Sequence, residues 1–211
     1  MATTRKPQSL VRHLPSRSPR LIIIAAENKY AEKQYFEEIL EGYTRAIIKV
    51  LPTEDSKSSP QHVIDRLHDF ISQYQEEGAS FGVSDEFWLM VDVDRWHKLE
   101  EVAKKAIESG YKLAISKPCF EVWLLCHYDD AFQNNISYCG HIEDLLSKKL
   151  GVNYKKCLRP SDIPYFRDNI EAAIKRSIQL DINPQHLWPQ QTGTHVYKVV
   201  QSIMNLKYSK S

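Results

Sequence analysis

The sequence predicts an α/β fold, with a mostly parallel four-stranded sheet flanked by helices and a helical C-terminal elaboration. Between residues 21 and 128, short apolar segments alternate four times with amphipathic segments of helical periodicity. After about residue 129 only helix-like segments and loops follow. The chain has 211 residues, of which 42% are hydrophobic and 26% charged, and this composition is that of a globular protein with one sizeable core.

The strands are expected at residues 21–26, 44–52, 86–94 and 111–116. The first, LIIIAA, is short, rich in isoleucine and lacks alternation, which is typical of a strand buried on both faces. Strands with this pattern, separated by helices, favour a parallel sheet.

Helices are expected wherever apolar residues recur with helical spacing. Glycines end the first three segments, and Pro60 lies in the first turn of the second. The fourth segment is apolar almost all round, which predicts a buried helix. The expected ranges are 30–42, 60–78, 97–110, 119–128, 140–150, 163–180 and 194–207.

Composition divides the chain into a basic arm (1–20), an α/β core (21–128) and a helical extension packed on that core (129–211). No acid precedes Glu27, and the arm carries Arg5, Lys6, Arg12, Arg17 and Arg20. It is interpreted as a solvated arm, a phosphate-contacting arm or a transit-like peptide, although Pro15 and Pro19 oppose an amphipathic helix. The net charge of +1 creates no overall field that would attract a polyanion.

No apolar run is long enough for a membrane span or a secretory signal, so a cytoplasmic protein with no membrane partner is expected. The cysteines at 119, 126, 139 and 157 contain no CxxC and are expected to be reduced thiols. Cys119 is interpreted as a small buried hydrophobic residue. Cys139 and His141 resemble half of a zinc site whose other half is missing.

Acidic residues lie at or just beyond the ends of three predicted strands. Glu27 follows the first strand, Asp92 and Asp94 end the third, and Glu121 lies one turn beyond the fourth. Residues two apart in a strand face the same side, roughly 6.5 Å apart. Two carboxylates this close repel each other unless a cation lies between them, and oxygen ligands suit Mg²⁺ or Mn²⁺. The alternative is that these acids are the solvated ends of strands.

Three segments resemble the signature segments of RloB-like proteins: ENKYAEKQYF (27–36), FWLMVDVDRW (87–96) and SKPCFEVWLLCHY (116–128). The third is the longest and most specific, and the resemblance covers roughly residues 16 to 205. Asn28 replaces the usual glycine and Ala31 the usual threonine. Asn is the residue that best replaces glycine at positive φ, but its side chain alters the surroundings of Glu27.

The resemblance implies a Toprim-like fold. In that fold Asp92 and Asp94 would bind Mg²⁺ or Mn²⁺, and the ion would activate a water. Glu27 would be a general acid/base or a metal-proximal carboxylate. It implies a nuclease that cleaves DNA, tRNA or other RNA, in a bacterial anti-phage system beside an AAA/ABC-type ATPase. Glu121 is the further catalytic candidate, with a first-turn glutamate favoured by the helix dipole as its alternative.

Two other functions stay open. A catalytically degenerate protein would serve as a sensor or regulator of the ATPase, and a DxD nucleotide-sugar transferase shares only the acidic pair. The sequence has no GxxxxGK[ST], so ATP hydrolysis would belong to another subunit. It also allows assembly into a homo-oligomer.

Five basic residues are candidates for binding nucleic acid. A loop near two tyrosines contains Lys155, Lys156 and Arg159, and the last helix begins with His195 and Lys198. Their alternative is a solvated surface.

Four further side chains have a structural and a functional interpretation. Glu32 is expected on an exposed first turn, and His127 is expected to be a hydrogen-bonded core histidine. Trp96 and His97 are expected to pack at a helix start, with contact to a nucleotide as the alternative.

Overall fold

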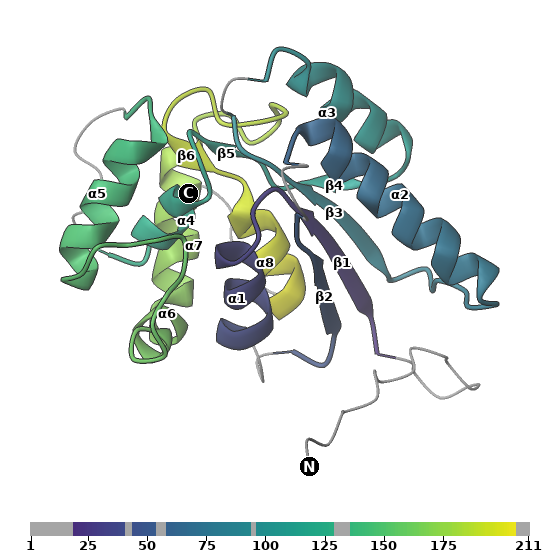
Figure 1. The fold of residues 1–211 in the computed structure, drawn as a ribbon, viewed down its shortest axis with the longest axis horizontal. Helices are drawn as coiled ribbons and strands as arrows, with labels where there is room; N and C mark the ends of the chain where they lie inside the picture. Colours follow the sequence, from purple (N-terminus) through teal and green to yellow (C-terminus); the bar gives the residue numbers. More distant parts are fainter. Residues whose placement is uncertain (1–18, 41–43, 54–57, 94–95, 129–135, 206–211) are drawn as a thin grey trace.

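The computed structural model describes residues 19–40, 44–53, 58–93, 96–128 and 136–205, so the predicted basic arm lies almost entirely outside the described residues. Its centre is a four-stranded parallel sheet with the strand order β2-β1-β3-β4, as Figure 1 shows. The strands are β1 (Leu21–Ala26), β2 (Ile47–Leu51), β3 (Glu86–Met90) and β4 (Lys112–Leu113). The predicted α/β class is confirmed, and the arrangement is that of a Rossmann-like or Toprim-like fold.

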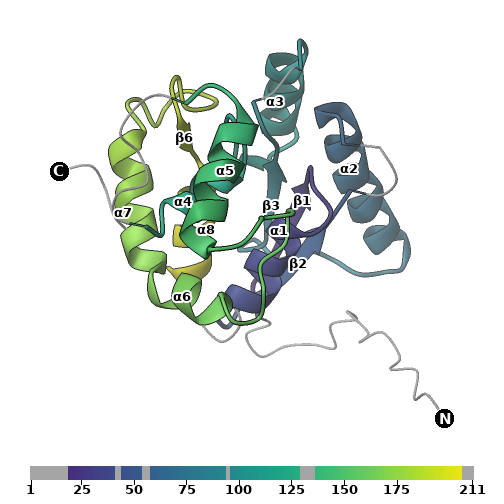
Figure 2. The same ribbon diagram turned by 60° about the vertical axis from the view of Figure 1, so that its left-hand side comes forward.

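Alternate residues of β1 face two separate hydrophobic cores. Leu21, Ile23 and Ala25 pack with the two helices on one face of the sheet, α2 (Pro60–Glu76) and α3 (Leu99–Glu108). Ile22, Ile24 and Ala26 pack with the remaining helices on the other face. In Figures 1 and 2 the sheet accordingly lies between α2 and α3 on one side and the other helices on the opposite side. All six residues of β1 are buried, as a strand without alternation predicts.

The second face is covered by N-terminal and C-terminal helices together. One core cluster extends from Ile22 in β1 to Ile203 near the end of the chain, so the C-terminal helices share a core with the sheet. The helices on this face are α1 (Ala31–Gln34) with its π-helical continuation η1 (Tyr35–Ile39), α4 (Glu121–Leu125), α5 (Cys139–Leu150), α6 (Ile163–Asp168), α7 (Ile170–Leu180) and α8 (Val196–Met204).

The structure differs from the prediction in the last strand of the sheet. The expected strand at 111–116 is two short strands, β4 and β5 (Ser116–Lys117). β5 pairs antiparallel with β6 (Gly193–Thr194), a strand in the part of the chain where only helices were expected. β6 was missed because two residues are too few to show strand alternation.

The long predicted C-terminal helix is also interrupted. The segment 163–180 divides at Asn169, whose φ of −108° and ψ of 12° are not helical. Asparagine favours helix ends over helix interiors, which accounts for the break.

Candidate active site

The carboxyl ends of β1 and β3 bring two of the predicted acids together. Ala26 pairs with Met90, and the backbone amide of the next residue, Glu27, donates a hydrogen bond to the Met90 carbonyl at 3.1 Å. The Glu27 Oε2 accepts the Asp92 backbone amide at 2.8 Å. Each of these acidic residues is 8% exposed. Two parallel strands therefore place Glu27 and Asp92 at one edge of the sheet, as predicted.

Two further acids reach the same region from helices. Glu32 in α1 is 1% exposed, and Glu121 at the start of α4 is fully buried. The charges of Glu27, Glu121 and Glu32 all act on the carboxyl of Asp92. The site is therefore a cluster of four buried carboxylates, which we call the acidic cluster.

Burial and mutual repulsion raise the pKa of two members of the acidic cluster. The pKa of Asp92 lies well above its ordinary value because of burial, to which the charges of Glu27, Glu121 and Glu32 add. Burial raises the pKa of Glu32 to about 7, with a further contribution from Glu121, although the bond from Asn28 opposes the rise. Bound protons or a cation would therefore stabilise the cluster.

Lys156 and Tyr154 are the partners of Glu121. The Lys156 Nζ lies 3.2 Å from the Glu121 Oε1 and 2.5 Å from the Glu143 Oε1. Burial alone would lower the pKa of Lys156, but the two carboxylates outweigh it and raise the pKa above its ordinary value. The Tyr154 hydroxyl donates to the Glu121 Oε1 at 3.3 Å. Glu121 is thus a fully buried acid with a cationic partner, which such a position requires.

The donor set of the acidic cluster is of the kind that a hard divalent cation prefers, but in the described part of the chain no three of its members have ligand atoms within 4.8 Å of one another. All four members offer carboxylate oxygens, the ligands that Mg²⁺ and Mn²⁺ prefer. The Glu32 Oε2 is buried and has no hydrogen-bond partner among the described residues, so it has capacity for another ligand. Asp94, the second acid of the DxD, lies outside the described residues.

A closer group of possible ligand atoms is formed by Cys119, Glu121 and Cys139, which lie within 4.8 Å of one another. The two sulfurs are joined as a disulfide, so they offer no thiolate to a metal. The expectation of reduced thiols is therefore wrong for these two residues, whereas Cys119 is buried in the hydrophobic core as expected. The 20-residue separation matches no sequence pattern, because the pair meets only once α5 has packed against α4.

Asn28 does not have the backbone conformation that its place in the glycine position suggested. Outside glycine, positive φ occurs in the described part of the chain only at Lys156 and Asn205. The Asn28 side chain instead donates to the Glu32 Oε1 at 2.6 Å. It therefore holds Glu32 in the acidic cluster.

Glu32 is the member of the cluster whose position was predicted wrongly, as an exposed first-turn residue. The sequence does contain a signal for its burial. Tyr35, Phe36 and Ile39 follow it at spacings of three, four and seven, and all three are fully buried. An acid on the apolar face of a helix therefore indicates a buried charge.

The predicted nucleic-acid residues do not form one group. Lys155 is exposed, Lys156 binds Glu121, and the Arg159 guanidinium pairs with Asp162 at 2.8 Å. His195 is buried with its Nε2 3.0 Å from the Asp181 Oδ2, and Lys198 donates to the Pro184 carbonyl at 2.8 Å. The role of these residues in binding nucleic acid stays a prediction.

His127 is a buried, hydrogen-bonded core residue, as expected. Its Nδ1 lies 3.1 Å from the Trp123 carbonyl, so Nδ1 carries the proton and Nε2 accepts from the Tyr35 hydroxyl at 3.0 Å. Burial lowers the pKa of His127 to about 3. The ring is therefore neutral at physiological pH.

Replacing Glu32 with glutamine should remove a pH-dependent loss of stability. Because the folded pKa of about 7 exceeds the ordinary 4.5, folding takes up a proton, and stability is lost as pH rises through about 7. The variant should match the wild type at about pH 4 and below, and exceed its free energy of unfolding by up to about 3 kcal/mol at pH 8.

The measurement is urea unfolding in EDTA across this pH range. Glu38→Gln, which removes an exposed acid of the same segment, is the control and should change little. Equal pH dependence in wild type and Glu32→Gln would contradict the raised pKa.

Comparison with known proteins gives one result that extends over most of the chain. The model of a protein family described as RloB-like protein matches residues 22–203. A search of curated proteins and a search of solved structures gave no match. In the part of the chain that the structure describes, no helix is long and apolar enough to cross a membrane.

Proposed function

The chain belongs to the RloB-like family, and from this premise we propose that it is a Mg²⁺-dependent nuclease that hydrolyses phosphodiester bonds of DNA or RNA. The observation that carries the proposal is the acidic cluster at the carboxyl ends of β1 and β3. Ligand sites of open α/β sheets lie at this edge, and clustered carboxylates are the usual ligands of Mg²⁺ in phosphoryl chemistry.

Asp92, with Asp94 as the second acid of the DxD, would hold the ion, Glu27 would lie beside it, and Glu32 and Glu121 would complete its surroundings. When bound, Mg²⁺ supplies positive charge for the phosphate and makes a water more acidic. The residues of the chain then orient the substrate and move protons.

Glu27 would accept a proton from the attacking water. The Asp92 amide and the Trp96 indole fix its two oxygens, at 2.8 Å and 3.2 Å. Each carboxylate oxygen has a second lone pair, so these two bonds orient the group and leave it able to accept a proton.

The role in anti-phage defence and the AAA/ABC-type ATPase partner are part of the proposal and follow from the family resemblance alone. Because the sequence lacks a GxxxxGK[ST] motif, nucleotide hydrolysis would belong to the partner subunit.

The test is cleavage of labelled DNA and tRNA by the purified chain, with Mg²⁺, Mn²⁺ or EDTA, with and without the candidate ATPase. Glu27→Gln should lower the rate of metal-dependent cleavage about a hundredfold, because proton transfer would be lost. Glu100→Gln, which neutralises an exposed acid of α3, should keep wild-type activity.

Absence of cleavage by the wild type under all these conditions would overturn the nuclease proposal. A degenerate protein that regulates the ATPase would then be favoured, and it would be detected as a change in the ATPase rate when this chain is added.

A further inference from the structure

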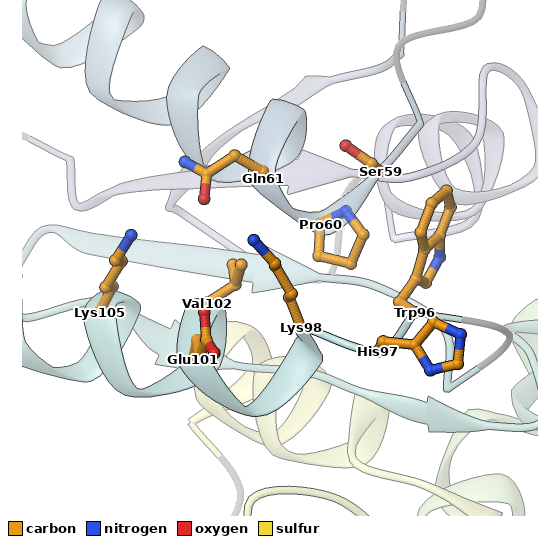
Figure 3. A pocket seen from close by; sticks show the side chains of 9 residues that line it. All are labelled: Ser59, Pro60, Gln61, Trp96, His97, Lys98, Glu101, Val102 and Lys105. Atoms are coloured by element: carbon orange, nitrogen blue, oxygen red, sulfur yellow. The ribbon is translucent and has the colours of Figure 1, made fainter.

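A pocket of about 580 Å³ lies between the start of α2 and the start of α3 (Figure 3). One side is formed by the beginning of α2, and the other by α3 and the segment that leads into it. The residues that line it include Pro60, Gln61, Trp96, His97, Lys98 and Lys105. Its volume is in the range of pockets that bind small ligands of nucleotide size.

Trp96 connects this pocket to the acidic cluster. Its Nε1 donates to the Glu27 Oε1 at 3.2 Å, and this bond fixes the orientation of the indole. The residue is nevertheless 37% exposed, so part of the ring remains open to the pocket. An oriented, partly exposed indole is a surface on which a base can stack.

The charge of the pocket suits a phosphate group. Lys98 and Lys105 line it on the α3 side, and Figure 3 shows both reaching toward the start of α2. Neither has an ion-pair partner among the described residues, and Glu101 is the one acid among the lining residues that the structure describes. The pocket therefore combines an aromatic surface with an excess of positive charge, which is the chemistry that recognises a nucleotide.

We propose that this pocket binds one unpaired nucleotide of the substrate strand, with its base stacked on Trp96 and its phosphate near Lys98 and Lys105. This inference rests on the proposed nuclease function and specifies its substrate as a single-stranded or unpaired segment. A base inside a duplex has both faces covered by its neighbours and cannot stack on a side chain unless it is flipped out. The bond between Trp96 and Glu27 places the bound nucleotide beside the phosphodiester that would be cleaved.

The test measures binding without turnover, so it does not depend on the nuclease proposal. Fluorescence anisotropy in EDTA would compare labelled 12-nucleotide single-stranded RNA and DNA with the same sequences as duplexes. The wild type should bind the single strands more tightly than the duplexes. Trp96→Ala should weaken single-strand binding about tenfold, whereas Trp96→Phe, which keeps an aromatic ring, should retain most of it.

The lysines have their own readout in the salt dependence of binding. Lys98→Gln and Lys105→Gln should each reduce the slope of log K against log salt concentration by about 0.7, the value for one contact to a single strand. Lys104→Gln is the matched control, because Lys104 lies on the same helix, pairs with Glu100 and does not line the pocket. It should leave the slope unchanged.

Three outcomes would overturn the inference: no binding by the wild type, equal affinity for single strands and duplexes, or equal binding by Trp96→Ala and wild type. Displacement of the oligonucleotide by low concentrations of AMP or ATP would instead assign the pocket to a free nucleotide. Binding in EDTA that depends on Trp96, together with no cleavage in the separate assay with Mg²⁺ or Mn²⁺ and the candidate ATPase, would uphold the pocket and overturn the nuclease proposal.

Discussion

Asp92→Asn should lower metal-dependent cleavage at least about a thousandfold, because several kcal/mol of transition-state stabilisation by the ion would be lost. The same change should raise the melting temperature in EDTA at pH 8. Asp92 is buried among Glu27, Glu32 and Glu121, and its raised pKa shows that its charged form is unfavourable in the fold. An amide of the same shape removes that charge.

Two measurements separate the catalytic effect from the effect on stability. The first is the single-turnover rate of cleavage, and the second is the thermal melting temperature with and without Mn²⁺. Mn²⁺ should raise the melting temperature of the wild type and have little effect on Asp92→Asn, because a ligand that binds the folded state stabilises it.

Glu100→Gln, the exposed-acid control, should behave as wild type in both measurements. If Asp92→Asn is less stable than wild type in EDTA and keeps its response to Mn²⁺, then the acidic cluster is not a cation site.

The sheet could be predicted from sequence because its strands are buried on both faces. LIIIAA cannot be a surface segment, and helices of regular periodicity between such strands require parallel neighbours. β6 and the break at Asn169 could not be predicted in the same way, because each involves two residues or fewer. At this length, contacts with the rest of the fold determine the local structure more than periodicity does.

The candidate site was predictable to the extent that it lies on strand ends. The pairing of parallel strands brings Glu27 and Asp92 together at one edge of the sheet, independently of the conformation of the loops. The positions of Lys156 and the disulfide beside the site depend on how α5 and the loop after it pack against α4. Neither the spacing of residues nor the composition predicts that packing.

Lys156 is therefore the second residue for which a large effect is expected. Lys156→Met should lower the free energy of unfolding by about 2–3 kcal/mol at pH 8, because the fully buried Glu121 would lose its cation. The lysine side chain is 40% exposed, so solvent screening keeps the effect below that of a fully buried pair.

The loss should depend on divalent ions, because without Lys156 the fully buried Glu121 carboxylate has no compensating positive charge. Mn²⁺ should then stabilise Lys156→Met more than it stabilises the wild type, since the ion would replace the missing positive charge.

A double-mutant cycle with Glu121→Gln isolates the pair, because neutralising the acid should recover most of the stability lost with the lysine. Lys155→Met is the matched control, since the neighbouring lysine is exposed and should contribute little. If Lys156→Met and Glu121→Gln destabilise additively, the lysine acts through packing and not as the counter-charge of the acidic cluster. Coupling between them would show that Lys156 is the counter-charge of Glu121.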